Sequence, residues 1–277
     1  MKFTFNNTTI HYEVFGEGKP LLALHGWTLD HNYMMNIIEP SFIDRDGWKR
    51  YYIDLPGHGK SIGSNMLKSG DDVLEILLAF IDSQFNGKKF AVAGFSFGGV
   101  LARGLIGKRS DQVAGLFVIA PDIEHGSDKE ELPPRTLLVR NDEVVAELQP
   151  QERDLGLFQM TIVDQSFETL SLMRKYIFPP YSKTNREYLS DISDKYMTSI
   201  DETILSEPYN RPALLLMGRQ DNLTGYRNVW SIIENYPRAT FAVLDCAGHH
   251  VGGVERVGVS RALISDWIDR MEEDDRI

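Results

Sequence analysis

The 277-residue sequence predicts an α/β fold in which a mostly parallel β-sheet is flanked by helices. Short apolar runs of strand length alternate with longer segments whose apolar residues recur at helical spacing. This alternation is typical of a parallel sheet wrapped by helices. The alternation stops at about residue 121 and resumes at about residue 208, so a helical insertion within the core is expected as well.

The chain is expected to begin with an antiparallel hairpin. Residues 2–5 and 9–15 alternate apolar and polar side chains, which is typical of half-buried strands. Asn6 and Asn7 lie between the two segments, and asparagine is a common turn residue.

The core elements follow in chain order. Apolar runs predict strands at residues 21–24, 50–53, 89–93, 114–120, 213–217 and 240–244. Apolar residues at helical spacing predict helices at residues 72–85, 100–108, 225–236 and 257–271. The predicted core domain therefore has two parts, residues 1–121 and 209–277, on either side of the insertion.

Residues 122–208 are expected to form a helical cap, or lid, over the core. They are richer in charge than the core, and segments 163–176 and 188–200 have helical periodicity. Surface helices without a gating role are the alternative. Some apolar residues of the insertion are expected to face the substrate pocket and others to pack its own helices: Leu157, Phe158, Met160, Ile162, Phe167 and Leu170.

Composition excludes several classes of protein. The formal net charge of −11 lacks the basic balance of a nucleic-acid-binding protein, and a single cysteine, Cys246, excludes an intrachain disulfide framework. The first residues lack the apolar core of a secretory signal, and no run approaches the ~18 apolar residues that span a bilayer. We therefore expect a cytoplasmic protein without nucleic-acid or membrane partners. A small-molecule substrate is expected as well, and both a monomer and a homodimer stay open.

Residues 94–99, with the sequence GFSFGG, are the centre of the predicted chemistry. They place a G-x-S-x-G pattern between a predicted strand and a predicted helix, which is the setting of a nucleophile elbow. Ser96 would lie on a strained turn, while Gly94 and Gly98 let the strand and the helix approach closely. The helix that starts after Ser96 would point N–H groups and its positive end toward an oxyanion formed there.

Ser96, Asp221 and His249 are the candidate catalytic residues. A serine hydroxyl is a weak nucleophile at neutral pH and needs an imidazole to take its proton and a carboxylate to orient that imidazole. Each of the three follows a predicted strand, and the carboxyl ends of parallel strands meet at one edge of a sheet. Asp122 is the alternative acid, and His250 is the alternative base.

An oxyanion needs two hydrogen-bond donors, which we expect to be the backbone N–H groups of Phe97 and Trp27. Phe97 directly follows the nucleophile, and Trp27 lies in the loop after His25. The Trp27 indole is also expected to wall the acyl pocket. His25 and His58 are expected to support turns through hydrogen bonds rather than to act as further bases.

Five motifs in this order resemble the α/β-hydrolase superfamily, in its serine-nucleophile, esterase-like branch. They are HGW at 25–27, DLPGHGKS at 54–61, GFSFGG at 94–99, GRQD at 218–221 and AGH at 247–249. The resemblance runs from about residue 10 to the end of the chain, is weakest in the insertion, and implies the fold and the triad. Serine at the elbow differs from the aspartate of dehalogenase and epoxide hydrolase branches, and the HGGPG signature of proline iminopeptidases is missing.

The resemblance implies a serine hydrolase that cleaves a small carboxylic ester through an acyl-enzyme. A carbon–carbon bond hydrolase or lyase and a cofactor-free perhydrolase use the same triad and are alternatives. A ligand receptor that retains the triad without turnover is a non-enzymatic alternative. Neither a metal nor an organic cofactor is expected in the reaction, because no compact ligand spacing such as H-E-x-x-H occurs.

Overall fold

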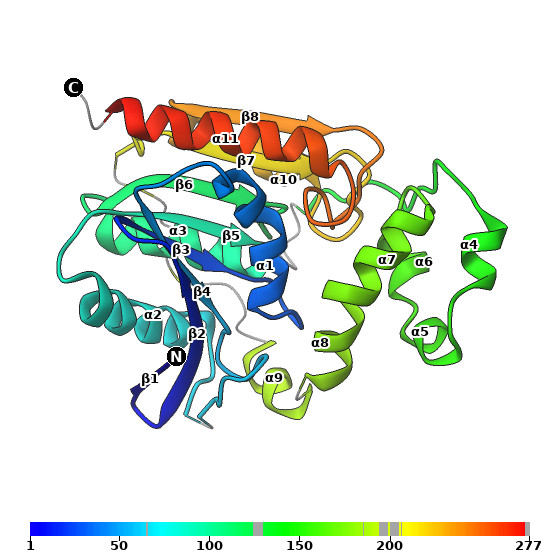
Figure 1. The fold of residues 1–277 in the computed structure, drawn as a ribbon, viewed down its shortest axis with the longest axis horizontal. Coiled ribbons are helices and arrows are strands. Elements are labelled where there is room, and N and C mark those ends of the chain that lie inside the picture. The colour runs from blue at the N-terminus through cyan, green and yellow to red at the C-terminus, as the bar shows by residue number, and fades with distance from the viewer. Residues whose placement is uncertain are drawn as a thin grey trace.

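A computed structural model describes residues 1–64, 66–123, 130–184, 186–193, 199, 205 and 207–274. Its centre is an eight-stranded sheet in the order β1-β2-β4-β3-β5-β6-β7-β8 (Figure 1). The strands are β1 (Lys2–Phe5), β2 (Thr8–Phe15), β3 (Lys19–Leu24), β4 (Trp48–Ile53), β5 (Phe90–Phe95), β6 (Val113–Ile119), β7 (Ala213–Gly218) and β8 (Ala239–Leu244). Strands β3 to β8 pair in parallel, while β1 and β2 form an antiparallel hairpin whose second strand pairs with β4. The predicted fold class is confirmed.

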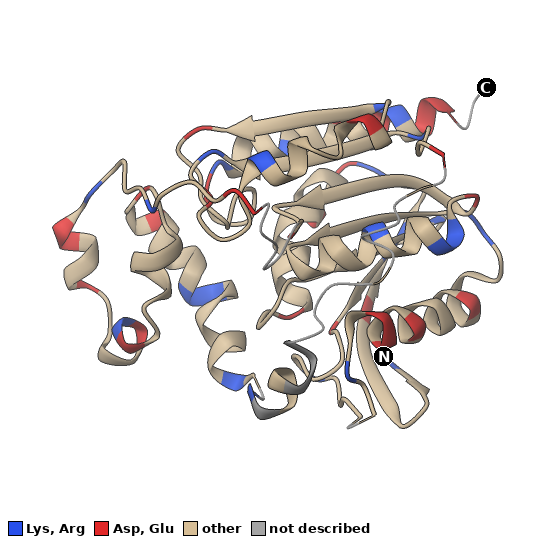
Figure 2. Ribbon diagram, turned by 180° about the vertical axis from the view of Figure 1, so that it is seen from behind, with Lys and Arg blue, Asp and Glu red and all other residues tan. Residues whose placement is uncertain are grey.

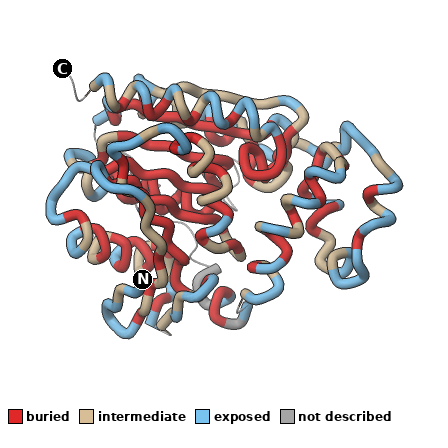
Figure 3. Tube along the Cα trace, viewed as in Figure 1, coloured by how far each residue is buried: buried red, intermediate tan, exposed pale blue. Residues whose placement is uncertain are grey.

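Helices cover both faces of the sheet. They are α1 (His31–Ile38), α2 (Gly70–Phe85), α3 (Phe97–Arg109), α10 (Tyr226–Trp230) and α11 (Val257–Asp274). One buried cluster joins the sheet to α2, α3 and α10, and another joins it to α1 and α11. Figure 3 shows the central strands of the sheet buried between the helices, whose outer sides are exposed. Most charged residues lie on the helices and loops (Figure 2), a few lie in β1 to β4, and β5 to β8 contain none.

Strand β5 shows why an entirely apolar run is needed at the centre of this sheet. All of its residues are buried, and successive side chains enter opposite clusters. Val92 packs toward α2 and α3, whereas Ala91 and Ala93 pack toward α1 and α11. Because the side chains of a strand alternate between the two faces, a polar residue at any of these positions would be buried without water.

In the described part of the chain, six helices lie between β6 and β7, and we refer to the described residues between 130 and 193 as the cap segment. They are α4 (Asp142–Ala146), α5 (Pro150–Leu155), α6 (Leu157–Thr161), α7 (Phe167–Tyr176), α8 (Phe178–Lys183) and α9 (Arg186–Ser193). Figure 1 shows the cap segment beside the sheet rather than within its layers. Of the predicted helix at 188–200, residues 194–198 and 200 lie outside the described part.

Two predicted helices have different boundaries in the structure. The helix expected at 163–176 begins at Phe167, because the Ser166 side chain caps it by accepting a hydrogen bond from the Thr169 N–H. The helix expected at 225–236 is divided into α10 and a short 3₁₀ helix, η2 (Ile233–Asn235). Helix α1, followed by the 3₁₀ helix η1 (Glu39–Phe42), has no counterpart in the sequence-based prediction.

The apolar residues of the cap segment have three different environments. Phe158, Ile162 and Leu170 are buried in the cluster that also contains α1 and α11. Leu157 and Met160 line a cavity described below. Phe167 is 55% exposed, so the expectation that it faces the pocket or packs the cap segment was wrong. In the part of the chain that the structure describes, no helix is both long and apolar enough to cross a membrane.

Candidate active site

Ser96 occupies the sharp turn between β5 and α3. Its backbone has φ 51° and ψ −117°, a left-handed conformation that is unfavourable for any residue with a Cβ. The Ser96 N–H donates to the Ile119 carbonyl at 2.9 Å, and the Gly99 N–H donates to the Ser96 carbonyl at 2.8 Å. Backbone hydrogen bonds on both sides therefore hold the strained residue in place.

The glycines around Ser96 are required by close backbone contacts. A Cβ on Gly94 would lie 2.1 Å from the Gly98 carbonyl oxygen, and a Cβ on Gly98 would lie 2.2 Å from the Leu24 carbonyl oxygen. Both separations are far shorter than a van der Waals contact. The sequence-based explanation of the two glycines is thus confirmed: the strand and the helix can meet only without side chains at these positions.

Asp221 and His249 form a buried hydrogen-bonded pair. The His249 Nδ1 lies 3.0 Å from the Asp221 Oδ2. The Asp221 carboxylate also accepts hydrogen bonds from the Leu223 N–H at 2.9 Å and from the Thr224 hydroxyl at 2.8 Å. Burial raises the pKa of Asp221, but the neighbouring His249 ring and the hydrogen bonds from His249, Leu223 and Thr224 together outweigh burial and hold this pKa below its ordinary value. Asp221 is therefore an ionised acceptor that orients the imidazole.

The alternative residues, His250 and Asp122, have other surroundings. The His250 Nδ1 lies 3.2 Å from the Tyr33 hydroxyl, and burial lowers the pKa of His250 to about 3. A ring with this pKa stays neutral at physiological pH. Asp122 lines the cavity, but the carboxylate bonded to His249 Nδ1 is that of Asp221.

Ser96 and His249 line the same cavity, which has a volume of about 550 Å³. The core contributes Trp27, Phe95, Asp122 and Thr224 to its wall, and the cap segment contributes Leu157, Met160, Ile177, Tyr181, Arg186 and Leu189. The His249 ring packs on Phe95, the residue before Ser96, with ring centroids 4.9 Å apart. This volume suits a small organic ligand, and the cap side of the wall is mainly apolar.

Trp27 of the cavity wall packs against Phe97. Phe97 is the first residue of α3, and the Trp27 ring contacts the Phe97 ring edge-on with centroids 5.3 Å apart. Trp27 lines the cavity, as the sequence led us to expect. The Thr28 hydroxyl donates to the Trp27 carbonyl at 2.6 Å, which helps to fix the loop.

His25 supports the loop that carries Trp27, and His58 supports the neighbouring turn after β4. The His25 Nδ1 donates to the Gly26 carbonyl at 2.7 Å, and its Nε2 accepts from the Leu55 N–H at 2.9 Å. The His58 Nδ1 donates to the Pro56 carbonyl at 3.0 Å, and burial lowers the pKa of His58 to about 3. Their predicted structural role is thus confirmed for both rings.

Glu255 is a residue of this region that the sequence analysis missed. Glu255 is 4% exposed, and its carboxylate accepts three backbone N–H groups, from Gly248 at 2.7 Å, Val163 at 2.7 Å and Asp164 at 3.0 Å. Gly248 directly precedes His249, whereas Val163 and Asp164 belong to the cap segment. Glu255 therefore joins the loop that carries His249 to the cap. An isolated glutamate bound to distant backbone groups leaves no pattern in a sequence.

Replacing Glu255 by glutamine is expected to lower kcat by about 10- to 100-fold, because the loop that carries His249 would shift. A glutamine amide has one acceptor oxygen, and its NH₂ group would face a backbone N–H where the carboxylate now accepts. The measurement is kcat and KM on a p-nitrophenyl ester, with thermal unfolding as a check of folding. Glu234, an exposed residue of η2, provides the control Glu234→Gln. An unchanged kcat in folded Glu255→Gln would show that Glu255 does not position His249.

Comparison with known proteins gives a consistent result. The family model for the alpha/beta hydrolase fold matches residues 19–255. A pimeloyl-[acyl-carrier protein] methyl ester esterase of Nitrosomonas europaea is 24% identical over 247 residues, covering 87% of this chain and 92% of the relative. An alpha/beta superfamily hydrolase of Oenococcus oeni has a similar structure, with a TM-score of 0.87, 23% identity, and coverage of 98% of this chain and 99% of the other.

A third similar structure is a meta-cleavage product hydrolase of Pseudomonas fluorescens, with a TM-score of 0.69 and 18% identity over 97% of each chain. At 18% identity, this structural similarity shows only that the two chains share a fold. The family model, in contrast, spans most of the sequence and includes the elbow and the Asp221–His249 pair. The resemblance that the motifs indicated is therefore confirmed, and the chain belongs to the alpha/beta hydrolase fold family.

Proposed function

We propose that this protein is a serine hydrolase that cleaves a small carboxylic ester through an acyl-enzyme. The observation that carries the proposal is the Asp221–His249 hydrogen bond at a cavity whose wall also contains Ser96. A strained serine, an oriented imidazole and a buried carboxylate are the three parts that serine hydrolysis requires.

In the proposed reaction, the Ser96 Oγ attacks the acyl carbon while His249 Nε2 takes the hydroxyl proton. The Asp221 carboxylate accepts the hydrogen bond of His249 Nδ1–H, which keeps Nε2 free to act as the base. The backbone N–H groups of Phe97 and Trp27 stabilise the negative oxygen of the tetrahedral intermediate. The alcohol leaves with the proton from His249, and water, deprotonated by the same ring, then releases the acid and restores Ser96.

The choice of an ester as substrate rests on the relatives and on the cavity. The similar proteins of Nitrosomonas europaea and Vibrio campbellii are both named as methyl ester esterases. The apolar side chains of Leu157, Ile177 and Leu189 in the cavity wall suit the hydrocarbon part of an acyl group.

Hydrolysis of p-nitrophenyl acetate tests the proposal. An acyl-enzyme mechanism predicts a burst of p-nitrophenol equal to the enzyme concentration, followed by slower turnover. A fluorophosphonate should label the enzyme at Ser96. Ligand binding without turnover would favour a receptor, and cleavage of a diketone in preference to esters would favour a carbon–carbon bond hydrolase; either result would contradict the proposal.

The cap segment is proposed to set the choice of acyl group. Met160 lines the cavity and is 43% exposed, so Met160→Ala should enlarge the pocket with little loss of stability. We expect the ratio of kcat/KM between long and short p-nitrophenyl esters to change by about 10-fold. Phe167→Ala is the matched control, because Phe167 is an exposed residue of the cap segment outside the cavity wall. If Met160→Ala gives the same kcat/KM ratio as Phe167→Ala, the cap segment does not determine the choice of acyl group.

A further inference from the structure

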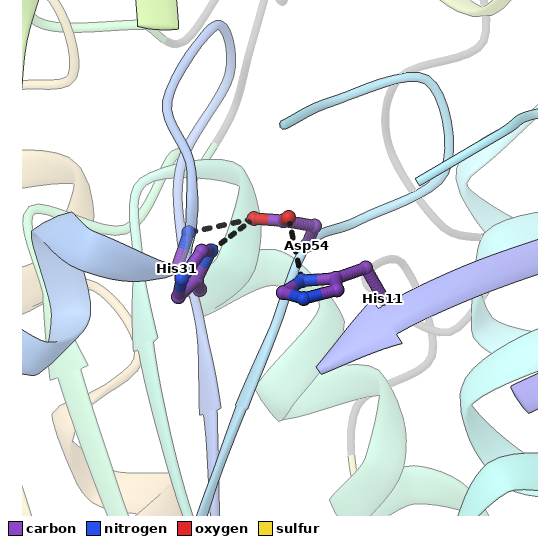
Figure 4. A group of neighbouring side chains, drawn as sticks. All are labelled: His11, His31 and Asp54. Atoms are coloured by element: carbon purple, nitrogen blue, oxygen red, sulfur yellow. Dashed lines mark hydrogen bonds and ion pairs between the residues drawn. The ribbon is translucent and has the colours of Figure 1, made fainter. Parts of the chain in front are cut away.

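A second group of chemically active side chains lies outside the cavity wall. His11 of β2, His31 at the start of α1 and Asp54 directly after β4 come together in Figure 4. The His31 Nδ1 lies 2.7 Å from the Asp54 Oδ1, and the His11 Nδ1 lies 3.1 Å from the Asp54 Oδ2. One nitrogen of each ring and one carboxylate oxygen all lie within 4.8 Å of one another.

The Asp54 carboxylate is wholly buried and requires positive charge nearby. Within the described residues, its ion-pair partners are the imidazoles of His11 and His31, with no lysine or arginine among them. A buried carboxylate is stable only when it is paired with a cation and fully hydrogen-bonded. Protons on the two imidazoles, or a metal ion bound by them, must therefore supply that charge.

Both ring nitrogens of His31 face carboxylate oxygens. Nδ1 faces Asp54, and Nε2 lies 3.2 Å from the Glu13 Oε1. Since an ionised carboxylate can only accept, each of these contacts needs a proton or a metal ion between its two atoms. A metal ion on the Nδ1 side would leave Nε2–H to donate to Glu13, and histidine ligands of metals are commonly oriented by such a carboxylate.

The backbone hydrogen bonds of Asp54 do not use the lone pairs that face the imidazoles. Oδ1 accepts the His31 N–H at 2.9 Å, and Oδ2 accepts the Lys60 N–H at 2.9 Å. Each oxygen thus uses one lone pair for a backbone amide and directs another toward an imidazole. A metal ion could replace the imidazole protons without breaking either backbone contact.

The distances and the access route fit a zinc-type ion. Two ligands of a tetrahedral zinc are separated by about 3.3 Å, given metal–ligand bonds of about 2.0–2.2 Å. To reach this separation, the present nitrogen–oxygen distances of 2.7 and 3.1 Å would open by about 0.6 and about 0.2 Å, respectively. The side chain of His11 is 12% exposed, so an ion and its remaining water ligand can reach the cluster from that side.

We propose that His11, His31 and Asp54 form a binding site for a divalent transition-metal ion of the zinc type, separate from the catalytic cavity. Two imidazole nitrogens and one carboxylate are donors that zinc prefers, and water would complete the coordination. Because the ligands come from β2, α1 and the end of β4, the ion would join three elements that are distant in the sequence. The role is structural and does not depend on the proposed ester hydrolysis.

Titration of the chelator-treated protein with ZnCl₂ in a calorimeter tests the site, with CoCl₂ as a spectroscopic probe of tetrahedral coordination. We expect one ion per chain and a raised thermal unfolding midpoint in its presence. His11→Gln should weaken zinc binding by at least about 10-fold and remove the midpoint shift. His11 is half-buried, so this variant tests the site even if His31→Gln fails to fold.

His249→Gln is the matched control, because it removes an imidazole that is bonded to a different buried carboxylate, that of Asp221. Zinc binding should be the same in His249→Gln as in the unmodified protein. Absence of saturable zinc binding would overturn the proposal, as would binding that His11→Gln leaves unchanged or that His249→Gln abolishes. Ester hydrolysis by the chelator-treated protein is a separate measurement, and its outcome bears on the proposed function alone.

Discussion

Replacing Ser96 by alanine is expected to lower kcat by about 10⁵- to 10⁶-fold while the protein remains folded. The substitution removes one hydroxyl from a residue that is 7% exposed at the cavity and leaves the backbone contacts of the elbow in place. His249→Ala should cause a loss of similar size, because the nucleophile and its base act as a unit. The measurement is kcat on p-nitrophenyl acetate, with circular dichroism to confirm folding.

Two further variants test whether Ser96 and His249 act together and whether His249, rather than His250, is the base. Ser96→Ala combined with His249→Ala should be no less active than either single variant, since each already removes the whole unit. His250→Ala should retain most of the turnover per folded molecule, because His250 contacts Tyr33 rather than Asp221. If His250→Ala abolishes turnover and His249→Ala does not, His249 is not the base.

Asp221→Asn is expected to lower kcat by about 10⁴-fold. The new NH₂ group would lie where the Asp221 Oδ2 now faces His249, and it would donate to Nδ1. The imidazole would then carry its proton on Nε2 and could not accept the proton of Ser96. The other carboxylate oxygen accepts the Leu223 and Thr224 N–H groups, and the asparagine carbonyl can do the same. The Thr224 hydroxyl, which now donates to Oδ2, can donate to the Ala120 carbonyl instead, so the loop should keep its conformation.

Asp122→Asn is the matched control for the acid. Asp122 is also a buried carboxylate of the cavity wall, but its substitution leaves the Asp221–His249 hydrogen bond intact. We expect a change in kcat far smaller than that of Asp221→Asn, measured on the same ester. If Asp122→Asn lowers kcat more than Asp221→Asn does, the catalytic carboxylate is that of Asp122.

The parts of the fold that the sequence predicted are those with strong local signals. Strand β5 is apolar throughout, and the glycines beside Ser96 are explained by contacts with backbone atoms. The pairing of Asp221 with His249 followed from their positions after two strands, because parallel strands end at one edge of the sheet.

The parts that the sequence did not predict depend on contacts between distant segments. Helix α1 has only eight residues, and the Asp30 side chain and the contacts of His31 with Asp54 hold its start. Helices of this length are marginal in isolation and form through tertiary packing. Glu255 and the His11–His31–Asp54 group likewise join segments whose proximity exists only in the folded chain.

The backbone of Ser96 has a consequence for how this protein can be stabilised. A positive φ at a non-glycine residue costs on the order of 1–3 kcal/mol, and glycine adopts this conformation without a steric penalty. The free energy of unfolding of natural proteins is only about 5–15 kcal/mol, so this cost is a measurable fraction of the total stability. A search for thermostable variants that ignores activity would therefore favour glycine at position 96 and eliminate the proposed nucleophile. Selection for heat resistance and selection for turnover act in opposite directions on this residue.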